Sequence, residues 1–207
     1  MLFDLLNQSV ISILFLAIGL VIAITFHEFS HAAMATFLGD ITPRLEGRLT
    51  LNPIRHLDLW GSLFLLIAGF GWGKPVPFNP NFIKYGKWGI AAIGAVGPLS
   101  NIFIAFVFIV VMKFGIVPAS FANLFMVIIF INLLLAIFNL IPISPLDGSK
   151  ILQALLPESK QEFVEKLEKQ GPIILLAILV LDNFFGFHIL SSIINPIFNF
   201  VWNILNF

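Results

Sequence analysis

Long apolar stretches separated by short polar segments dominate the pattern along the chain. The first runs from about Ser9 to Leu38 and ends at Gly39-Asp40, a typical helix stop. Further runs cover about Trp88 to Met112 and Phe121 to Ile141, and a fourth begins at Pro172. A helix needs about 20 apolar residues to cross a bilayer. The pattern therefore predicts four transmembrane helices.

The segment between the first two spans has a different pattern. Arg44 to Leu51 alternates polar and apolar residues around a glycine, which predicts a strand or hairpin. Gly61 to Trp72 is apolar but only 12 residues long, too short to span as a helix. We interpret it as a re-entrant or interfacial element. A plain linker is the alternative, and the apolar content argues against it.

Two segments follow the third span. Pro157 to Gln170 carries most of the acidic residues of the C-terminal part and predicts a solvated helix. Ser191 to Phe207 is apolar with asparagines at every fourth position, Asn195, Asn199 and Asn203. That stripe predicts a helix that lies in the membrane interface or packs on the bundle. Whether this segment instead forms a fifth transmembrane span is left open.

Composition places the chain in the membrane. It is 59% hydrophobic and 11% charged, against roughly 25% charged residues in soluble domains. We expect one all-α polytopic domain over 1–207, with a core at about 9–156 and C-terminal helices at about 157–207. The start of the chain lacks a basic region, so the first run is expected to be a permanent helix. Zero net charge gives no support for nucleic-acid binding, and the absence of cysteine excludes a thiolate metal site.

Basic residues predict the orientation. Ten of the eleven lie between spans one and two or between spans three and four, and Lys113 is the exception. The positive-inside rule makes those loops cytoplasmic. The ends of spans one and three then meet near the cytoplasmic face.

The sequence His27-Glu28-Phe29-Ser30-His31 lies inside the first apolar run. Residues four apart share one helix face, so both imidazoles can bind one zinc ion. Glu28 can reach a water at the same ion. A chance match is the alternative, but ionisable groups inside a span are costly unless they are paired or bound to a metal.

A zinc site of this type needs a third protein ligand. Asp147 follows the third span on the side of the membrane expected for His27 and His31. Taken alone, Asp147 would be the cap of a helix over Ser149 to Leu156. Asp182 and His188 offer a second possible metal pair, although an interfacial position suits them better.

These motifs resemble the site-2 protease family of intramembrane zinc metalloproteases. HEFSH resembles the family's HExxH, and Asn139 to Gly148 resembles its NxxPxPxLDG motif, with Ser144 where the family usually has proline. Gly97 to Asn101 resembles the motif of the family's second core helix. The resemblance covers about residues 15–155 and is to the compact form without PDZ or CBS domains.

The resemblance implies one zinc ion per chain, held by His27, His31 and Asp147, with Glu28 as the catalytic acid and base. It implies that Asn139, and less directly Asn101, donate hydrogen bonds to the substrate backbone or the oxyanion. The expected substrate is a transmembrane protein in the lipid bilayer of a bacterial or archaeal plasma membrane; the oligomeric state stays open. A divalent-metal transporter is the main alternative, and a catalytically silent adaptor is a third.

Overall fold

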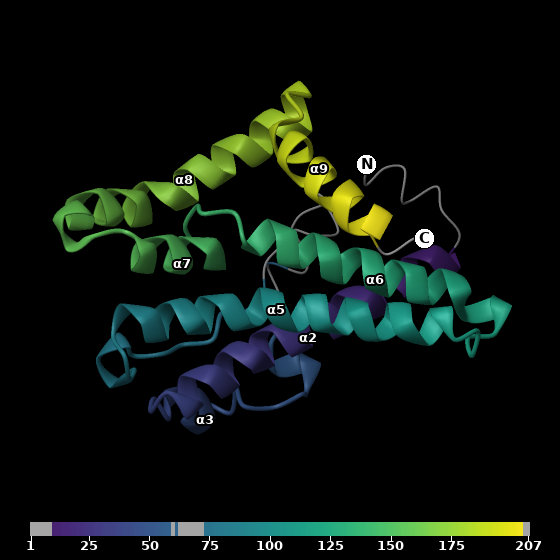
Figure 1. Ribbon diagram of the computed structural model, residues 1–207, viewed down its shortest axis with the longest axis horizontal. Helices are drawn as coiled ribbons and strands as arrows, with labels where there is room; N and C mark the ends of the chain where they lie inside the picture. Colours follow the sequence, from purple (N-terminus) through teal and green to yellow (C-terminus); the bar gives the residue numbers. More distant parts are fainter. Residues whose placement is uncertain (1–9, 59–60, 62–72, 205–207) are drawn as a thin grey trace.

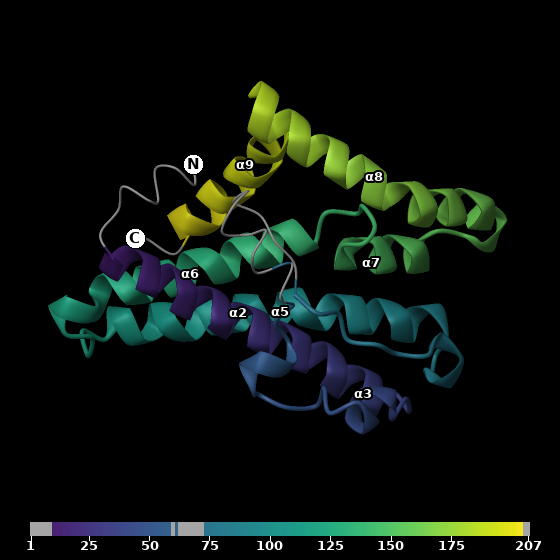
Figure 2. The same cartoon turned by 180° about the vertical axis from the view of Figure 1, so that it is seen from behind.

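The computed structural model describes residues 10–58, 61 and 73–204 and is built from helices. Three long helices form its centre: α2 (Val10–Phe37), α5 (Lys87–Lys113) and α6 (Ala119–Asn139). All three pack on one another (Figures 1 and 2). Each is long and apolar enough to cross a membrane. The first three predicted spans are thus confirmed as helices, with ends shifted by at most two residues.

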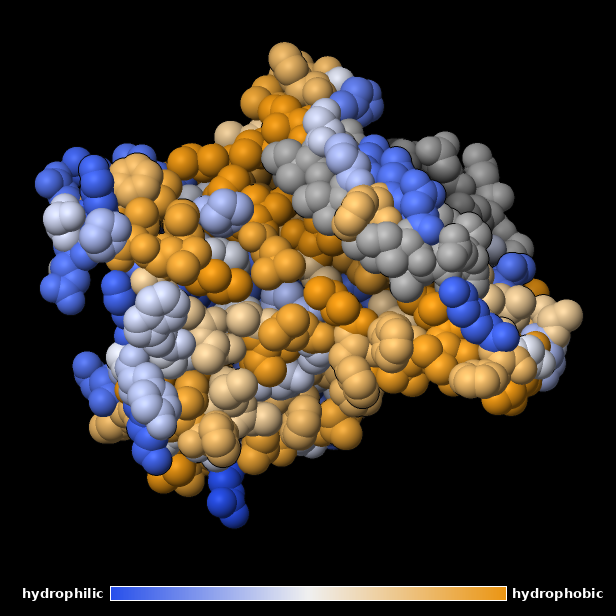
Figure 3. Space-filling view, viewed as in Figure 1, coloured by the Kyte–Doolittle hydropathy of each residue, from blue (hydrophilic) through white to orange (hydrophobic). Residues whose placement is uncertain are grey.

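Small residues fill the contacts between these helices. Gly19, Ala23, Ala32 and Ala35 are the small buried residues of α2, while larger apolar side chains of the same helix face outward. In lipid, helices gain little from burying large apolar groups and associate through close backbone contact. The space-filling view accordingly shows a largely apolar surface (Figure 3). Hydrophilic side chains gather at the end of the molecule where α5 and α8 begin.

The loop after α2 begins as the sequence predicts. Gly39 has a φ of 113°, a backbone conformation that glycine adopts readily. Directly after it, the Asp40 carboxylate accepts hydrogen bonds from the Thr42 backbone N–H and hydroxyl. Pro43 follows in the first turn of α3 (Thr42–Leu45). Both features favour a helical start.

The predicted strand or hairpin over Arg44 to Leu51 is therefore wrong. That segment contains the end of α3 and a turn, and the described residues contain only an isolated antiparallel bridge, between Leu57 and Gly73. Alternation over eight residues is a weak signal, and the capping interactions of Asp40 and Pro43 decide the local structure. The predicted re-entrant element lies mostly outside the described residues.

Short helices connect the long ones. In the loop before α5 lie η1 (Pro53–Arg55) and η2 (Pro80–Phe82). After α6, the chain turns into α7 (Asp147–Leu155), which packs on α5. η3 (Glu158–Lys160) then leads into α8. The contact of α7 with α5 places the segment that follows the third span against the second span.

The C-terminal helices differ in part from expectation. α8 (Gln161–Phe185) runs through Pro172 and joins the predicted solvated helix and the apolar segment into one element. Only its second half is apolar, so the described chain has three membrane-spanning candidates, and the count of four is not confirmed. α9 (Ile189–Ile204) packs against α6, where the rings of Phe130 and Phe198 lie 5.2 Å apart. The tail was expected to lie in the membrane interface or to pack on the bundle, and α9 packs on the bundle.

Candidate metal centre

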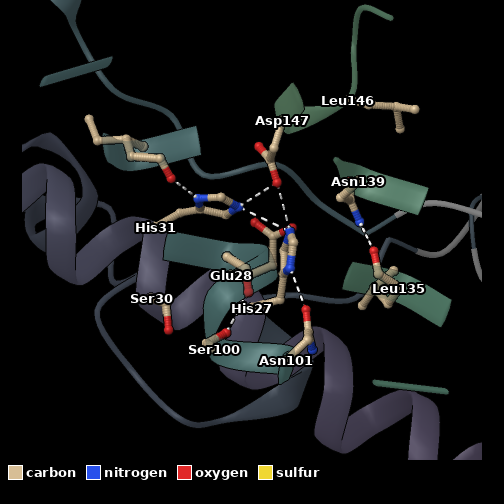
Figure 4. Close-up of polar contacts among 12 residues, drawn as sticks. His27, Glu28, Ser30, His31, Ser100, Asn101, Leu135, Asn139, Leu146 and Asp147 are labelled. Carbon is tan, nitrogen blue, oxygen red and sulfur yellow. Dashed lines mark hydrogen bonds and ion pairs between the residues drawn. The ribbon is translucent and has the colours of Figure 1, made fainter. Parts of the chain in front are cut away.

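Three potential metal ligands converge between α2 and α7. His27 and His31 lie one turn apart on α2, and their Nε2 atoms are 3.0 Å from each other. The Oδ2 atom of Asp147, the first residue of α7, is 3.1 Å from both (Figure 4). All three side chains are buried. Among the described residues, this is the cluster of histidine and carboxylate groups with metal-binding geometry.

The hydrogen-bond partners determine the tautomer of both histidines. Nδ1 of His27 lies 2.7 Å from Oδ1 of Asn101, and Nδ1 of His31 lies 2.6 Å from the carbonyl oxygen of Ile93. Both partners are acceptors, so each Nδ1 carries a hydrogen and donates. In neutral imidazoles, each Nε2 then presents a lone pair toward the other and toward Asp147. Three electron-pair donors therefore face one another without a hydrogen between them.

This donor set fits zinc. Two imidazole nitrogens and a carboxylate oxygen form a common ligand set of catalytic zinc sites. Tetrahedral coordination with bonds of about 2.0–2.2 Å separates ligand atoms by about 3.3 Å. The observed triangle would have to open by only about 0.3 Å. A cation at this position would also relieve the repulsion among the three lone pairs.

Lys150 orients the carboxylate of Asp147. Its Nζ lies 2.8 Å from Oδ1, one turn along α7. The lysine thereby occupies one carboxylate oxygen and leaves Oδ2 for the histidines. Groups behind the direct ligands commonly orient metal ligands in this way.

Glycines of α5 provide the space for the cluster. A Cβ on Gly97 would lie 2.8 Å from Cε1 of His27 and still closer to Nε2 of His31. A Cβ on Gly94 would lie 2.9 Å from the carbonyl oxygen of Asp147. Small residues at these positions of α5 thus make room for the imidazoles and for α7.

A second asparagine, which sequence reasoning missed, supports the site. The Nδ2 group of Asn101 donates to the carbonyl of Ala23, at 3.0 Å, and to Oδ1 of Asn132, at 2.9 Å. Asn132 in turn donates to the carbonyl of Ile128. Both asparagines are fully buried. An amide in the middle of a membrane span needs a polar partner, and this general rule is the signal that could have identified Asn132 from the sequence.

This network corrects the expectation for Asn101. Both hydrogens of its amide are engaged and its oxygen accepts from His27, so it has no donor left for a substrate. Asn101 instead fixes the orientation of the His27 ring. It contacts Nδ1 of His27, whereas Nε2 of the same ring faces Asp147.

Glu28 lies beside the histidines (Figure 4). Its side chain is 14% exposed, and Oε2 is 3.9 Å from Nη2 of Arg48. Arg48 is buried, although the sequence places it in a polar loop. Sequence reasoning gave no signal for this arginine beyond its part in the charge pattern.

The remaining predicted site residues lie farther from the cluster or serve other contacts. Asn139 is the last residue of α6, and its Nδ2 donates to the carbonyl of Leu135 in the same helix, at 3.0 Å (Figure 4). Asp182 accepts a hydrogen bond from the backbone N–H of Ile189, at 2.6 Å, and so links α8 to α9. The cluster of His27, His31 and Asp147 includes neither Asp182 nor His188.

Comparisons with known proteins agree with this chemistry. The family model of "Peptidase family M50" matches residues 114–182. A Bacillus subtilis protein named "Putative zinc metalloprotease YwhC" is 38% identical over 80% of this chain and 80% of its own length. The Mycobacterium tuberculosis protein named Rip2 is 27% identical over 79% of this chain and 65% of its own length.

A more distant relative is archaeal. Zinc metalloprotease MJ0392 of Methanocaldococcus jannaschii is 27% identical over 74% of this chain and 37% of its own length. No solved structure gives a significant match. The identity to the Bacillus protein extends over most of both chains, and the apolar helices fit a multi-pass membrane protein. The chain belongs to peptidase family M50, the site-2 protease family, and is a zinc metalloendopeptidase.

Proposed function

We propose that this metalloendopeptidase is an intramembrane protease that hydrolyses a peptide bond in or near a transmembrane helix of its substrate. His27, His31 and Asp147 bind one zinc ion per chain. The observation that carries the proposal is the approach of their three donor atoms to within 3.1 Å of one another, inside a membrane-spanning candidate helix and at the start of α7.

The depth of the site supports an intramembrane reaction. The apolar part of α2 before His27 starts at Val10 and covers about 25 Å at 1.5 Å per residue. A hydrocarbon core is about 30 Å thick, so the cluster lies inside the membrane but near one face. Ten of eleven basic residues belong to the loops on that side, which favours the cytoplasmic face of a bacterial or archaeal plasma membrane.

The residues divide the chemistry between them. Zinc, when bound, supplies Lewis-acid polarisation of the scissile carbonyl and lowers the pKa of a water toward ~7. The Glu28 carboxylate takes the proton of the attacking water and passes it to the leaving amine. Asn101 and the carbonyl of Ile93 hold the imidazoles in the tautomers that present Nε2. The buried surroundings exclude bulk water and strengthen these interactions.

Asn139 has a proposed role in holding the substrate. It stands at the end of α6, and its amide group donates to the carbonyl of Leu135. In the proposed complex, this amide exchanges that bond for one to the substrate backbone or the oxyanion. Asn139→Ala should then lower the cleavage rate and leave zinc affinity unchanged.

A divalent-metal transporter is less well supported. Transport needs polar groups distributed through the thickness of the membrane. Among the described residues of α2, α5 and α6, the buried polar side chains are Thr25, His27, His31, Asn101 and Asn132. Those of His27, His31, Asn101 and Asn132 belong to one connected cluster. These four residues form a single site and do not line a transport path across the membrane.

The test is zinc content beside cleavage of a model transmembrane substrate by the purified protein in nanodiscs. Wild type and Glu28→Gln should each bind about one zinc ion, and only wild type should cleave. Glu158→Gln, which changes an exposed carboxylate in η3, is the matched control and should cleave normally. Full activity of Glu28→Gln would contradict the role of Glu28. Absence of zinc from wild type would overturn the metal site.

A further inference from the structure

A polar pocket lies in the loop region between α2 and α5, and one of its lining residues, Arg48, approaches Glu28. It has a volume of about 410 Å³, and its walls include Glu46, Arg48, Arg55, Lys74, Ile54 and Leu57. Three of these side chains are cationic and one is anionic. The pocket therefore has an excess of positive charge.

Arg48 is the deepest of these charges. The residue is only 3% exposed, and Nη2 donates to the backbone carbonyl of Lys74. Its Nε and Nη1 groups are buried and have no hydrogen-bond partner among the residues that the structure describes. A buried donor without an acceptor is costly, and more so when it belongs to a charged group. The wall of the pocket thus contains a guanidinium group that still needs an acceptor.

The contacts of Arg48 connect the pocket with the catalytic centre. The Oε2 atom of Glu28 is 3.9 Å from Nη2 of Arg48, beyond hydrogen-bond distance. Lys74, another residue of the wall, is fixed by a hydrogen bond from its backbone N–H to the carbonyl of His56, at 2.8 Å. A Cβ on Gly73 would lie 3.7 Å from Oε1 of Glu28. Arg48 therefore links the wall of the pocket to the proposed general base.

We propose that this pocket binds a carboxylate of the substrate polypeptide, an aspartate or glutamate side chain a few residues from the scissile bond on the cytoplasmic side. The proposal rests on the proposed intramembrane protease function. Arginine is suited to carboxylates because its N–H groups match the geometry of the carboxylate oxygens. Arg55 and Lys74, which are exposed, add attraction at the pocket mouth.

The anionic headgroup of a lipid is the competing occupant. The contact between Arg48 and Glu28 favours the substrate, because a ligand that binds Arg48 shares this guanidinium group with the catalytic carboxylate.

Measurements of substrate binding and of cleavage together test whether the pocket binds a substrate carboxylate. A set of fluorescent model substrates carries Asp or Asn at each juxtamembrane position in turn, in nanodiscs of phosphatidylcholine. Zinc-loaded Glu28→Gln reports Kd, and the active enzyme reports KM and kcat. At one or two neighbouring positions, Asp should bind about tenfold more tightly than Asn and lower KM with little change in kcat.

Variants of the pocket residues test whether the preference for Asp arises in the pocket. Arg55→Gln and Lys74→Gln should each reduce the preference for Asp, while Lys84→Gln, an exposed lysine outside the pocket, should retain it. Arg55→Glu should instead favour a Lys at the same substrate position. Arg48→Lys keeps the charge but removes the planar donors, and should also reduce the preference.

Each result decides the question. Equal binding of Asp and Asn substrates at every position overturns the proposal, whether or not cleavage occurs. Loss of the Asp preference on addition of phosphatidylglycerol, together with tighter retention of that lipid by wild type than by Arg55→Gln, would assign the pocket to a headgroup. A preference for Asp in binding without any cleavage by wild type would support the pocket and count against the proposed protease function.

Discussion

The amide of Asn101 donates a hydrogen bond to Oδ1 of Asn132, 2.9 Å away, and joins α5 to α6 directly behind the metal centre. Asn101 also accepts a hydrogen bond from Nδ1 of His27. The two bonds therefore form a chain from α6 through α5 to a proposed zinc ligand. All three side chains are buried among apolar helices. Replacement of any one of them leaves polar groups without partners.

We therefore predict that Asn132→Leu weakens zinc binding without touching a ligand. The change removes one of the two acceptors of the Asn101 amide and leaves only the carbonyl of Ala23, so the amide holds His27 less firmly. Loss of such a supporting group typically lowers metal affinity by about 10–100-fold. Competition with a chelator of known affinity measures the change in Kd.

The control is Asn199→Leu, which alters an exposed asparagine on α9. It should retain the wild-type affinity. Unchanged affinity in Asn132→Leu, with a clear loss in Asn101→Leu, would show that Asn101 holds His27 without help from α6.

Gly97→Ala should disrupt the site by steric overlap. The added methyl would lie 2.8 Å from Cε1 of His27 and closer still to Nε2 of His31. Because the glycine lies inside α5, the backbone has little freedom to move away. Zinc content should fall well below one per chain, although alanine favours helix more than glycine does.

Ser100→Ala on the same helix serves as the comparison. Its hydroxyl bonds to the carbonyl of Gly97 within α5, and its removal adds no atom near the histidines. Zinc content of both variants is measured by elemental analysis of folded, monodisperse protein. Normal zinc in Gly97→Ala would mean that the imidazoles have more room than the structure provides.

Features of the structure for which physical chemistry allows only one arrangement were predictable from the sequence. Apolar runs of spanning length have to become helices in lipid, and the spacing of His27 and His31 places them on one face. The distribution of basic residues placed Asp147 on the side of the histidines. The structure brings these three residues together as that reasoning requires.

Features that depend on tertiary contacts were not predictable. The alternation after α2 indicated a strand, but Asp40 and Pro43 start a helical turn there. The change from charged to apolar residues near Pro172 marks a change of surroundings, and α8 continues through it. Arg48 was counted as a loop cation, yet the contacts with Lys74 and Glu28 form only when the loop folds back on α2.

Lys150→Met should weaken zinc binding through Asp147. The lysine holds Oδ1 at 2.8 Å, so its loss lets the carboxylate rotate away from the histidines. We expect a decrease in affinity of about tenfold, at the low end for supporting groups. Lys87→Met, which removes a contact to the carbonyl of Leu156 at the other end of α7, is the matched control. Equal affinities in the two variants would exclude an orienting role for Lys150.

The loop between α2 and α5 should loosen in acid because of Asp40. Burial alone would raise the pKa of this carboxyl, but hydrogen bonds from the Thr42 hydroxyl and from the backbone of Asn79 and Thr42 outweigh it and hold the pKa below its usual value of 3.8. The charged form is thus favoured in the folded loop. Its stabilisation is complete above pH 3.8 and is lost as the pH falls through the lower pKa of the folded state.

Hydrogen exchange of the backbone N–H of Asn79, which donates to Asp40 at 2.6 Å, measures this loosening. After correction for intrinsic rates, protection should be constant from pH 7 to about 4 and should decrease below it. Asp40→Asn removes the titrating group, so its protection should be low at every pH and should lack the acid step. An acid step that persists in Asp40→Asn would assign the transition to another carboxylate. In the described part of the loop, the Asp40 side chain is the group that joins its start to Asn79 through a charge-assisted bond.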